Sequence, residues 1–350
     1  MTHDKPLDNT EDIVSHSEHE DTDVEEEIEQ PTSGIQGQII PDDHPDQIDA
    51  DADLTNDYPD DSEYVDLIHL KIRSMEDLNL GRFKNLKGLV LRQNLLDSIS
   101  DVKNINQDIE ELDFYDNRIK HISSHLNGLI KLKNLDLSFN KIRNIKNIEN
   151  LTELENLYFV QNKISEIVNL DNFTKLKNLE LGGNRISKIE NLDKLENLEE
   201  LWLGKNKIPR FENLNPLRNL KILSIQSNRI TKLEGLENLV NLEELYVSHN
   251  GIEKIEGLEN NKKLTTLDIT SNRITDLENL SHLTELTDLW ASSNKISSFD
   301  QVEKELKDLK QLDTVYFEGN PLQLQNPTSY RRKLIMFLPQ VQKIDATYVR

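Results

Sequence analysis

The stretch QSNRITKLEGLENLVNLEELYVSHNGIEKIEGLEN, residues 226–260, decides the fold because it contains one and a half copies of the same unit. Asn228 and Ile230 of the first copy return as Asn250 and Ile252, each 22 residues later. Outward from this stretch the asparagine recurs with spacings of 23, 23, seven times 22 and finally 26 residues, at Asn94, Asn117, Asn140, Asn162, Asn184, Asn206, Asn228, Asn250, Asn272, Asn294 and Asn320. A fixed period of this length indicates a repeat fold, in which each unit stacks on the next.

Apolar residues keep fixed places around each asparagine. Leu or Ile lies eight residues before it, an apolar pair lies five and three residues before it, as Leu179 and Leu181 do before Asn184, and usually Ile follows two residues after it. The alternation around the pair predicts a short strand whose apolar side chains point inward. This is the leucine-rich-repeat pattern. It predicts an α/β repeat solenoid, a horseshoe with a parallel sheet on its concave side.

The period also limits what the convex side can hold. A repeat of 22 residues is too short for a full crossover helix, so we expect short 3₁₀ or single-turn segments there. Eleven parallel strands, one for each asparagine, would make a concave sheet roughly 48 Å long at about 4.8 Å per strand. The asparagines are expected to be buried and to satisfy backbone groups of adjacent coils, because an amide both donates and accepts hydrogen bonds.

Charge divides the chain into segments. Residues 1–63 hold 22 Asp and Glu against one basic residue, Lys5, so they carry −21 of the formal charge of −23. A segment this acidic and this poor in apolar residues is predicted to be a disordered tail. Residues 64–325 are predicted to form the solenoid, with a degenerate half-repeat over 65–78 that covers its N-terminal edge.

The last segment, residues 326–350, is predicted to be a C-terminal repeat cap. Thr328 or Ser329 is placed to cap a short helix that runs through Phe337 and that Pro339 ends. The apolar side chains of Val341 and Ile344 are expected to pack back on the last coil.

The residues that catalysis or metal binding needs are missing or isolated. The chain has no cysteine, which excludes a disulfide framework and a thiolate site and favours an intracellular compartment. We find no Walker A, GxGxxG, GxSxG or HExxH motif, and the pairs His16 and His19, and His121 and His125, lack a third ligand. We therefore expect no enzyme, no cofactor and no metal, and the sequence predicts neither a signal peptide nor a membrane span.

One residue of each strand is expected to point into the concavity, between the two buried apolar positions. In chain order these residues are Val90, Asp113, Asp136, Tyr158, Glu180, Trp202, Ser224, Tyr246, Asp268, Trp290 and Tyr316. Five of the eleven are aromatic, and they include both tryptophans of the chain. Exposed tryptophan on a sheet has no role in folding, whereas Trp and Tyr are the residues most often found at binding hot spots. The concave face is therefore predicted to bind another protein.

Acidic residues dominate the same face. With the outward positions on either side, which add Glu111, Glu200, Glu244, Asp288 and Glu318, the 33 concave positions hold nine acidic residues and a single basic one, Arg92. An acidic and aromatic groove predicts a protein partner that presents Arg and Lys on a convex surface, and it argues against nucleic acid, whose phosphates would be repelled.

A row of basic residues follows the asparagines and is expected to line one rim of the solenoid. It consists of Arg118, Lys141, Lys163, Arg185, Lys207, Arg229, Arg273 and Lys295. We expect these side chains to pair with nearby Glu. The alternative is a secondary contact with an acidic segment.

The repeats resemble a known family. The runs LGKNKI (203–208), the opening stretch 226–260 and TVYFEGNPL (314–322), together with the ending YRRKLIMFLPQVQKIDATYVR (330–350), are similar to the leucine-rich-repeat regulatory subunits of protein phosphatase 1 over about residues 65–350. The resemblance implies that the phosphatase catalytic subunit binds the concave face away from its own active site. The residues it implies for this contact are Asp136, Tyr158, Glu180, Trp202, Asp268, Asp288, Trp290 and Tyr316.

Three of these positions depart from the family pattern, with Tyr158 and Trp202 where the family commonly has Phe, and Asp288 where it commonly has Glu. The resemblance further implies a regulatory subunit, monomeric when free, that controls the activity, maturation or nuclear localisation of the phosphatase. It implies a place in the nucleus and cytoplasm, a role in mitosis and chromosome segregation, and sometimes a second inhibitory subunit in the complex. The rival hypotheses are a splicing-type repeat adaptor for an RNA-binding protein, a bacterial invasion-type repeat protein, and an enzyme.

Overall fold

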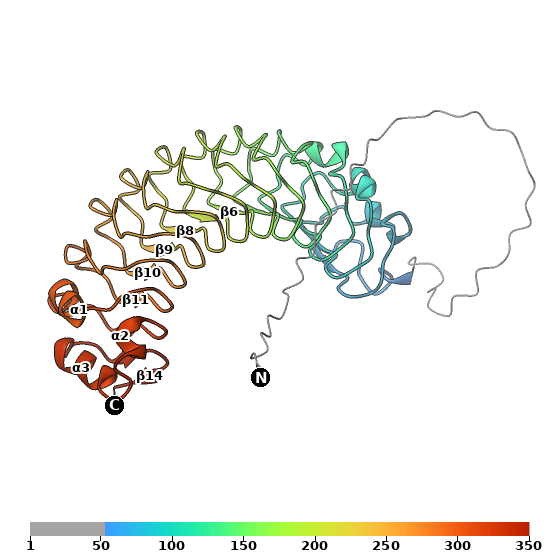
Figure 1. Cartoon of the computed structure of the whole chain (residues 1–350). Helices are drawn as coiled ribbons and strands as arrows, with labels where there is room; N and C mark the ends of the chain where they lie inside the picture. Colours follow the sequence, from blue (N-terminus) through green and yellow to red (C-terminus); the bar gives the residue numbers. More distant parts are fainter. Residues whose placement is uncertain (1–52, 350) are drawn as a thin grey trace, which may run out of the picture. The chain divides into compact units, whose positions relative to one another are not determined.

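The structure is a computed structural model that describes residues 53–349. Figure 1 shows these residues as coils stacked in an arc, with a short strand in each coil. Fourteen strands join in chain order into one sheet: β1 Tyr64–Asp66, β2 Gly88–Val90, β3 Glu111–Asp113, β4 Asn134–Asp136, β5 Asn156–Tyr158, β6 Asn178–Glu180, β7 Glu200–Trp202, β8 Ile222–Ser224, β9 Glu244–Tyr246, β10 Thr266–Asp268, β11 Asp288–Trp290, β12 Thr314–Tyr316, β13 Lys343–Ile344 and β14 Thr347–Tyr348. The predicted leucine-rich-repeat solenoid with a parallel sheet is confirmed.

The eleven strands expected from the asparagine period are β2 to β12, and three more extend the sheet. β1 pairs with β2 in parallel at the N-terminal edge. β13 pairs in parallel with β12, and β14 returns antiparallel to β13. The period could not reveal these strands, because they lie in the end coils, where the asparagine is absent.

Each of the strands β1 to β12 is three residues long, and its central residue belongs to the core. Leu157, Leu179 and Leu201 are opposite one another on successive strands, and each is 0% exposed. The next apolar residue of each coil, such as Leu181 or Leu203, is equally buried. A coil therefore shields its apolar residues only by stacking on its neighbours, which is why a single repeat would not fold alone.

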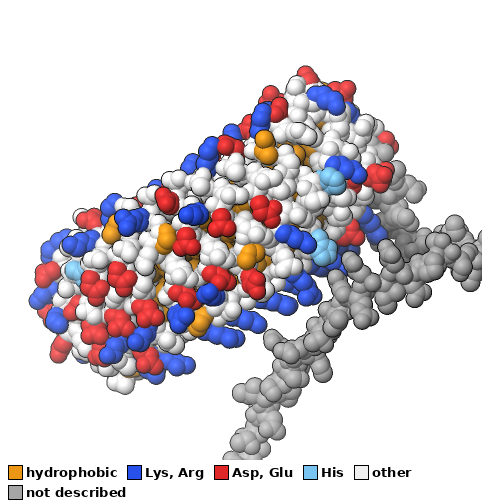
Figure 2. All heavy atoms as spheres, turned by 90° about the horizontal axis from the view of Figure 1, so that it is seen from above, with side chains coloured by type: hydrophobic (Ala, Val, Ile, Leu, Met, Phe, Trp, Pro, Cys, Tyr) orange, Lys and Arg blue, Asp and Glu red, His pale blue; other side chains and the backbone are white. Residues whose placement is uncertain are grey.

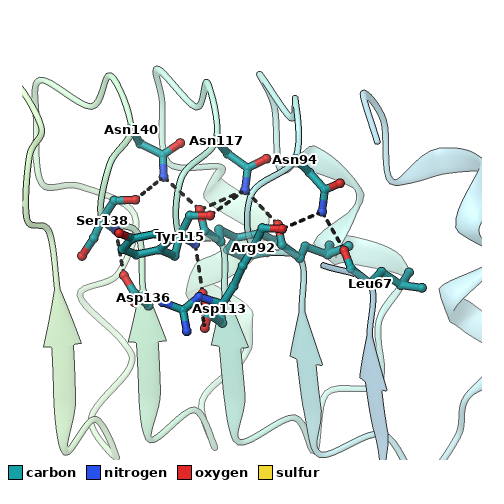
Figure 3. A network of polar contacts seen from close by, with 11 residues as sticks. Leu67, Arg92, Asn94, Asp113, Tyr115, Asn117, Asp136, Ser138 and Asn140 are labelled. Carbon is teal, nitrogen blue, oxygen red and sulfur yellow. Dashed lines mark hydrogen bonds and ion pairs between the residues drawn. The ribbon is translucent and has the colours of Figure 1, made fainter. Parts of the chain in front are cut away.

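The period asparagines hold adjacent coils together as expected. The Asn162 Nδ2 donates to the carbonyls of Leu137 (2.9 Å) and Phe159 (3.1 Å), and its Oδ1 accepts from the N–H of Ile142 (2.9 Å). Figure 3 shows Asn94, Asn117 and Asn140 in successive coils, each donating to carbonyls of its own coil and of the coil before it.

A second set of asparagines, which the sequence analysis did not single out, links the coils at a later turn. Asn147, Asn169, Asn191, Asn213 and Asn279 all have φ between 56° and 62°, in the left-handed region that asparagine tolerates. The Asn169 Nδ2 donates to the carbonyl of Ile145 in the preceding coil at 2.7 Å. Gly235 and Gly257, with φ of 70° and 71°, take the same place in two other coils. Asn and Gly therefore occupy this turn because both residues tolerate its left-handed backbone conformation.

The length of each repeat decides what covers its convex side. The two 23-residue repeats contain the 3₁₀ segments η4 (Ser100–Asn104) and η5 (Ser124–Gly128), and the first coil contains η2 (Glu76–Leu78) and η3 (Leu80–Arg82). The repeats of 22 residues have only turns there, so the expected 3₁₀ segments are limited to the N-terminal coils. The last spacing, of 26 residues, accommodates the helix α1 (Phe299–Leu306).

The ordered N-terminal edge begins earlier than predicted. Residues 53–63, assigned from charge to the acidic tail, pack on the first coil. Thr55 is 1% exposed and its hydroxyl donates to the Leu78 carbonyl at 3.1 Å, while the Tyr58 and Phe83 rings meet edge to face at 6.4 Å. The charge count could not separate these residues from the tail, because their acidic side chains all face solvent while Leu54, Thr55 and Tyr58 pack inward. The prediction of disorder for residues 1–52 lies outside the described residues.

Helix α2 (Pro321–Leu324) follows the last period asparagine, and the segment predicted as the C-terminal cap contains helix α3 (Tyr330–Phe337). α3 ends as predicted, and of the two candidates Thr328 and Ser329 it is Ser329 that takes the N-cap position, but its side chain makes no capping hydrogen bond. Val341 (4% exposed) and Ile344 (0%) pack on the last coil as expected. Asp345 completes the cap, because its carboxylate accepts from the Phe317 N–H at 3.0 Å and from the Tyr330 hydroxyl at 3.0 Å.

Candidate functional site: the concave face

The sheet register brings the predicted concave residues into one row. Asp136, Tyr158, Glu180 and Trp202 are opposite one another on β4 to β7, and Asp268, Trp290 and Tyr316 are opposite one another on β10 to β12. Asp288 lies at the start of β11, two residues before Trp290. The structure thus places all eight residues implied by the resemblance on the concave face, in two groups separated by β8 and β9.

An aromatic ladder runs across the C-terminal half of this face, and we define it as Trp202, Tyr246, Trp290 and Tyr316. Consecutive ring centroids are 6.3 Å, 6.1 Å and 6.3 Å apart. The first three rings lie on every second strand, so they lean toward each other over the smaller side chains between them. Those side chains are Ser224 (1% exposed) and Asp268 (8% exposed). Ring packing leaves both tryptophans half-buried, whereas the sequence predicted that they are exposed.

Tyr246 is the member of the ladder that the resemblance did not include among the contact residues. Its ring is the link between the two tryptophans, and its hydroxyl donates to Glu244 at 2.6 Å. Burial, followed by this hydrogen bond, raises the pKa of Tyr246. The sequence did indicate Tyr246, because it is one of the eleven residues expected to point into the concavity.

The indole N–H groups of the ladder have different surroundings. Trp202 Nε1 donates to the Glu200 carboxylate at 3.2 Å, which orients the ring along its own strand. Trp290 Nε1 is buried and has no hydrogen-bond partner among the described residues. An unpaired buried donor is unfavourable, so the packing of the Trp290 ring between Tyr246 and Tyr316 has to offset it.

The N-terminal half of the face is acidic. Burial, and after it the charge of Asp136, raises the pKa of Glu180, and burial together with the Glu180 charge raises the pKa of Tyr158. Burial also raises the pKa of Asp113 to about 6, although its carboxylate pairs with Arg92 at 3.3 Å. Among the nine concave acidic residues, Asp113 alone makes an ion pair within residues 53–349. The other eight have no basic side chain within 4.0 Å among the described residues, so no ion pair compensates their negative charge.

The concave aspartates are held by the backbone. The Oδ1 atoms of Asp113, Asp136 and Asp268 each accept from the N–H two residues later, at 3.0 Å, 2.8 Å and 3.0 Å. Figure 3 shows Asp113 and Asp136 on adjacent strands, with Arg92 and Tyr115 close by. Their carboxylates are therefore positioned before any partner arrives, which reduces the entropy lost on binding.

The two rims of the sheet carry their basic residues differently. At the N-terminal ends of the strands, Lys side chains pair with Glu of the preceding coil: Lys133 with Glu110 at 2.7 Å, Lys177 with Glu155 at 2.7 Å and Lys221 with Glu199 at 2.6 Å. We call these three pairs the paired rim. The row of basic residues that follows the asparagines makes no ion pair within the described range, so the expectation that it pairs with Glu was wrong.

Other kinds of site were also sought in residues 53–349. No group of three or more His, Asp or Glu side chains in this range is arranged to hold a metal ion. Over the same range, none of the helices reaches the length and hydropathy that crossing a bilayer requires. His16 and His19 lie outside the described residues.

Comparisons with known proteins agree with the repeat pattern. A family profile described as "Leucine Rich repeats (2 copies)" matches successive windows between residues 152 and 282. Among solved structures, an internalin (inlF) from Listeria monocytogenes is similar with a TM-score of 0.66 and 23% identity, over 81% of this chain and 87% of that one. A leucine-rich-repeat protein of Leptospira interrogans is similar with a TM-score of 0.62 and 26% identity, over 75% and 73% of the two chains. These likenesses concern the fold.

Curated relatives are more similar in sequence, over shorter stretches. The protein phosphatase 1 regulatory subunit SDS22 of Saccharomyces cerevisiae is 64% identical over 115 residues, which is 33% of this chain and 34% of that protein. Its namesake from Schizosaccharomyces pombe is 53% identical over 110 residues, or 31% and 27% of the two chains. Protein phosphatase 1 regulatory subunit 7 of Mus musculus is 56% identical over 46 residues, 13% and 12% of the two chains. The matches thus span about a third or less of each relative. The chain is a leucine-rich-repeat protein, and its curated relatives are regulatory subunits of protein phosphatase 1, which confirms the family resemblance seen in its repeats.

Proposed function

We propose that this chain is a non-catalytic regulatory subunit that binds the catalytic subunit of protein phosphatase 1 on its concave face. The names of the curated relatives support the choice of partner. The observation that carries the choice of surface is the aromatic ladder, Trp202 to Tyr316, beside carboxylates that lack basic partners within the described residues. Half-buried rings supply contact area at low entropic loss, and unpaired carboxylates attract a basic surface.

The contact residues of the proposal are those named from the resemblance, with Tyr246 added. Asp136, Tyr158 and Glu180 would meet basic side chains of the partner in the N-terminal half, and the aromatic ladder would anchor the C-terminal half. Binding there would control the activity, maturation or nuclear localisation of the phosphatase, in the nucleus and cytoplasm, with room for a second inhibitory subunit elsewhere on the complex.

The test is direct binding of purified protein phosphatase 1 catalytic subunit to the full chain. Trp202→Ala and Trp290→Ala should each weaken binding by about 2 kcal/mol or more, roughly 30-fold in affinity, with little change in melting temperature. Val240→Ala is the control, since Val240 is 47% exposed in the turn before β9 and is not one of the concave positions. If the wild-type chain does not bind, the partner is wrong. If both tryptophan variants bind like wild type, the surface is wrong.

The rival functions predict different binding partners or activities. A splicing-type adaptor would be isolated from cell extract with an RNA-binding protein, and nuclease treatment would release RNA from that complex. An enzyme would show phosphatase activity in a preparation free of any catalytic subunit. Direct contact of the concave face with RNA or with a phosphorylated substrate is not expected, because the charge of that face repels phosphate groups.

A further inference from the structure

A row of basic side chains, which we call the basic ladder, lines the rim that follows the strands. Its members take the same repeat position, directly after the period asparagine: Arg118, Lys141, Lys163, Arg185, Lys207, Arg229, Arg273 and Lys295. The backbone of each is fixed to the coil before it, as when the N–H of Arg185 donates to the Ile164 carbonyl and that of Lys207 to the Ile186 carbonyl, both at 2.8 Å. Gly251 takes this position in the one coil that interrupts the row. The charges are therefore carried on a rigid frame, one per coil.

These cations lack counter-charges. Seven of the eight side chains are exposed and Lys163 is half-buried, and none comes within 4.0 Å of a carboxylate in the part of the chain that the structure describes. The paired rim shows that this fold can neutralise a lysine from the adjacent coil, as Glu155 does for Lys177 at 2.7 Å. Figure 2 shows Lys and Arg side chains gathered along the edges of the stack.

A row of like charges on adjacent coils is self-repelling, and the strand spacing of about 4.8 Å keeps neighbouring members within a Debye length of each other. An anionic chain lying along the row would relieve that repulsion at several points at once. A compact anion would meet only one or two members. The arrangement therefore fits an elongated ligand with repeated negative charges.

We propose that the basic ladder binds an extended acidic segment of a polypeptide. An extended peptide places side chains of one face roughly 6.6 to 6.8 Å apart, a step that the long Lys and Arg side chains can follow. Nucleic acid fits less well, because proteins that bind single strands combine basic groups with aromatic rings on which the bases stack, and none of the ladder positions holds an aromatic residue. The ladder is a second surface, and it does not depend on the proposed phosphatase contact.

The test measures how a fluorescent oligoglutamate peptide binds the full chain, by anisotropy at low and at moderate salt. The ladder variant combines Arg185→Gln, Lys207→Gln and Arg229→Gln. The control variant combines Lys133→Gln, Lys177→Gln and Lys221→Gln on the paired rim, so that both variants lose the same net charge. We expect the ladder variant to bind about tenfold more weakly and the control to change less than about twofold. Thermal melting of both variants checks that their folds are intact.

Three results would overturn the proposal. One is equal weakening by the two variants, which would mean that only net charge matters. Another is absence of oligoglutamate binding to the wild-type chain at low salt. The third is tighter binding of a single-stranded oligonucleotide than of the peptide, because the ligand class would then be nucleic acid.

Discussion

The rings of Trp202 and Tyr246 are stacked, with centroids 6.3 Å apart and an interplanar angle of 19°, although Trp202 lies on β7 and Tyr246 on β9, with β8 between these strands. That strand, β8, presents Ser224, whose small side chain is 1% exposed beneath the two rings. Tyr246 also reaches Trp290 on its other side at 6.1 Å. The aromatic ladder is thus one continuous surface, and Tyr246 is its centre.

Replacing Tyr246 should therefore affect partner binding as much as replacing a tryptophan. We expect Tyr246→Ala to weaken binding of the phosphatase catalytic subunit by about 2 kcal/mol, because it removes contact area and the support of both neighbouring rings. Tyr246→Phe keeps the ring and loses only the hydrogen bond to Glu244, so its loss should stay below about 1 kcal/mol. Isothermal titration calorimetry distinguishes the two. Equal losses in both variants would show that the hydroxyl, not the ring, makes the contact.

Substitution of a buried strand leucine should have the opposite profile. Leu201 is 0% exposed, beside Trp202, and Leu201→Ala should lower the free energy of unfolding by about 2 to 5 kcal/mol because it leaves a cavity between coils. Urea unfolding followed by circular dichroism measures this change, with Trp202→Ala as the matched variant on the opposite face of the same strand. A larger loss of stability for Trp202→Ala would contradict the assignment of the two faces.

The second asparagine set makes a prediction about backbone shape. Asn169 has φ of 62°, and its side chain donates to the Ile145 carbonyl at 2.7 Å. Asn169→Gly keeps the left-handed conformation and loses one hydrogen bond, so it should cost about 0.5 to 1.5 kcal/mol of stability. Asn169→Val should cost more, by about 1 to 2 kcal/mol, because a β-branched residue is strained there. If the two variants melt at the same temperature, the left-handed backbone conformation at residue 169 does not affect stability.

Asp113 should make stability depend on pH. Its pKa is about 6 in the folded chain against an ordinary value of 3.8, so between these values the folded state binds the proton more readily than the unfolded state. The stability that this group contributes is full below about pH 3.8 and is lost as the pH rises toward 6.

Asp113→Asn should therefore raise the melting temperature near pH 7 and bring little gain near pH 4. The amide oxygen can still accept from the Tyr115 N–H, and the half-exposed Arg92 loses only a weak pair. Melting curves of both chains across this pH range give the comparison. A gain that is the same at every pH would point to a cause other than the carboxyl group.

Residues 53–63 should contribute to stability. A chain that begins at residue 64 should unfold with about 1 to 3 kcal/mol less free energy than one that begins at residue 53, because it loses the Thr55 hydrogen bond and the Tyr58 ring on Phe83. Tyr58→Ala in the full chain separates the ring from the rest of the segment. Indistinguishable unfolding curves for the two truncated chains would show that residues 53–63 do not stabilise the solenoid.

The sequence by itself determined the repeat architecture. The apolar positions around each period asparagine can be buried in only one way at this spacing, and an amide such as Asn162 can pair in the interior only by bridging two coils. The same alternation determined which residues face the concavity, because side chains of a strand point to opposite faces by turns. All eight site residues implied by the resemblance therefore lie on the concave face, whereas their role in binding stays a prediction.

Tertiary structure decided what happens between side chains of different coils. The lean of Tyr246 toward Trp202 over Ser224 depends on three strands at once, and the pairing of Lys177 with Glu155, while Arg185 stays unpaired among the described residues, depends on where each rim meets the coil before it. The contacts at the two ends of the solenoid also could not be predicted from the repeat period. Thr55 forms a hydrogen bond with Leu78, 23 residues away, and Asp345 with Phe317, 28 residues away. The regular spacing of the repeats predicts which coils are adjacent. Contacts between side chains of different coils depend on side-chain size, direction and charge, and they form only when the coils are stacked.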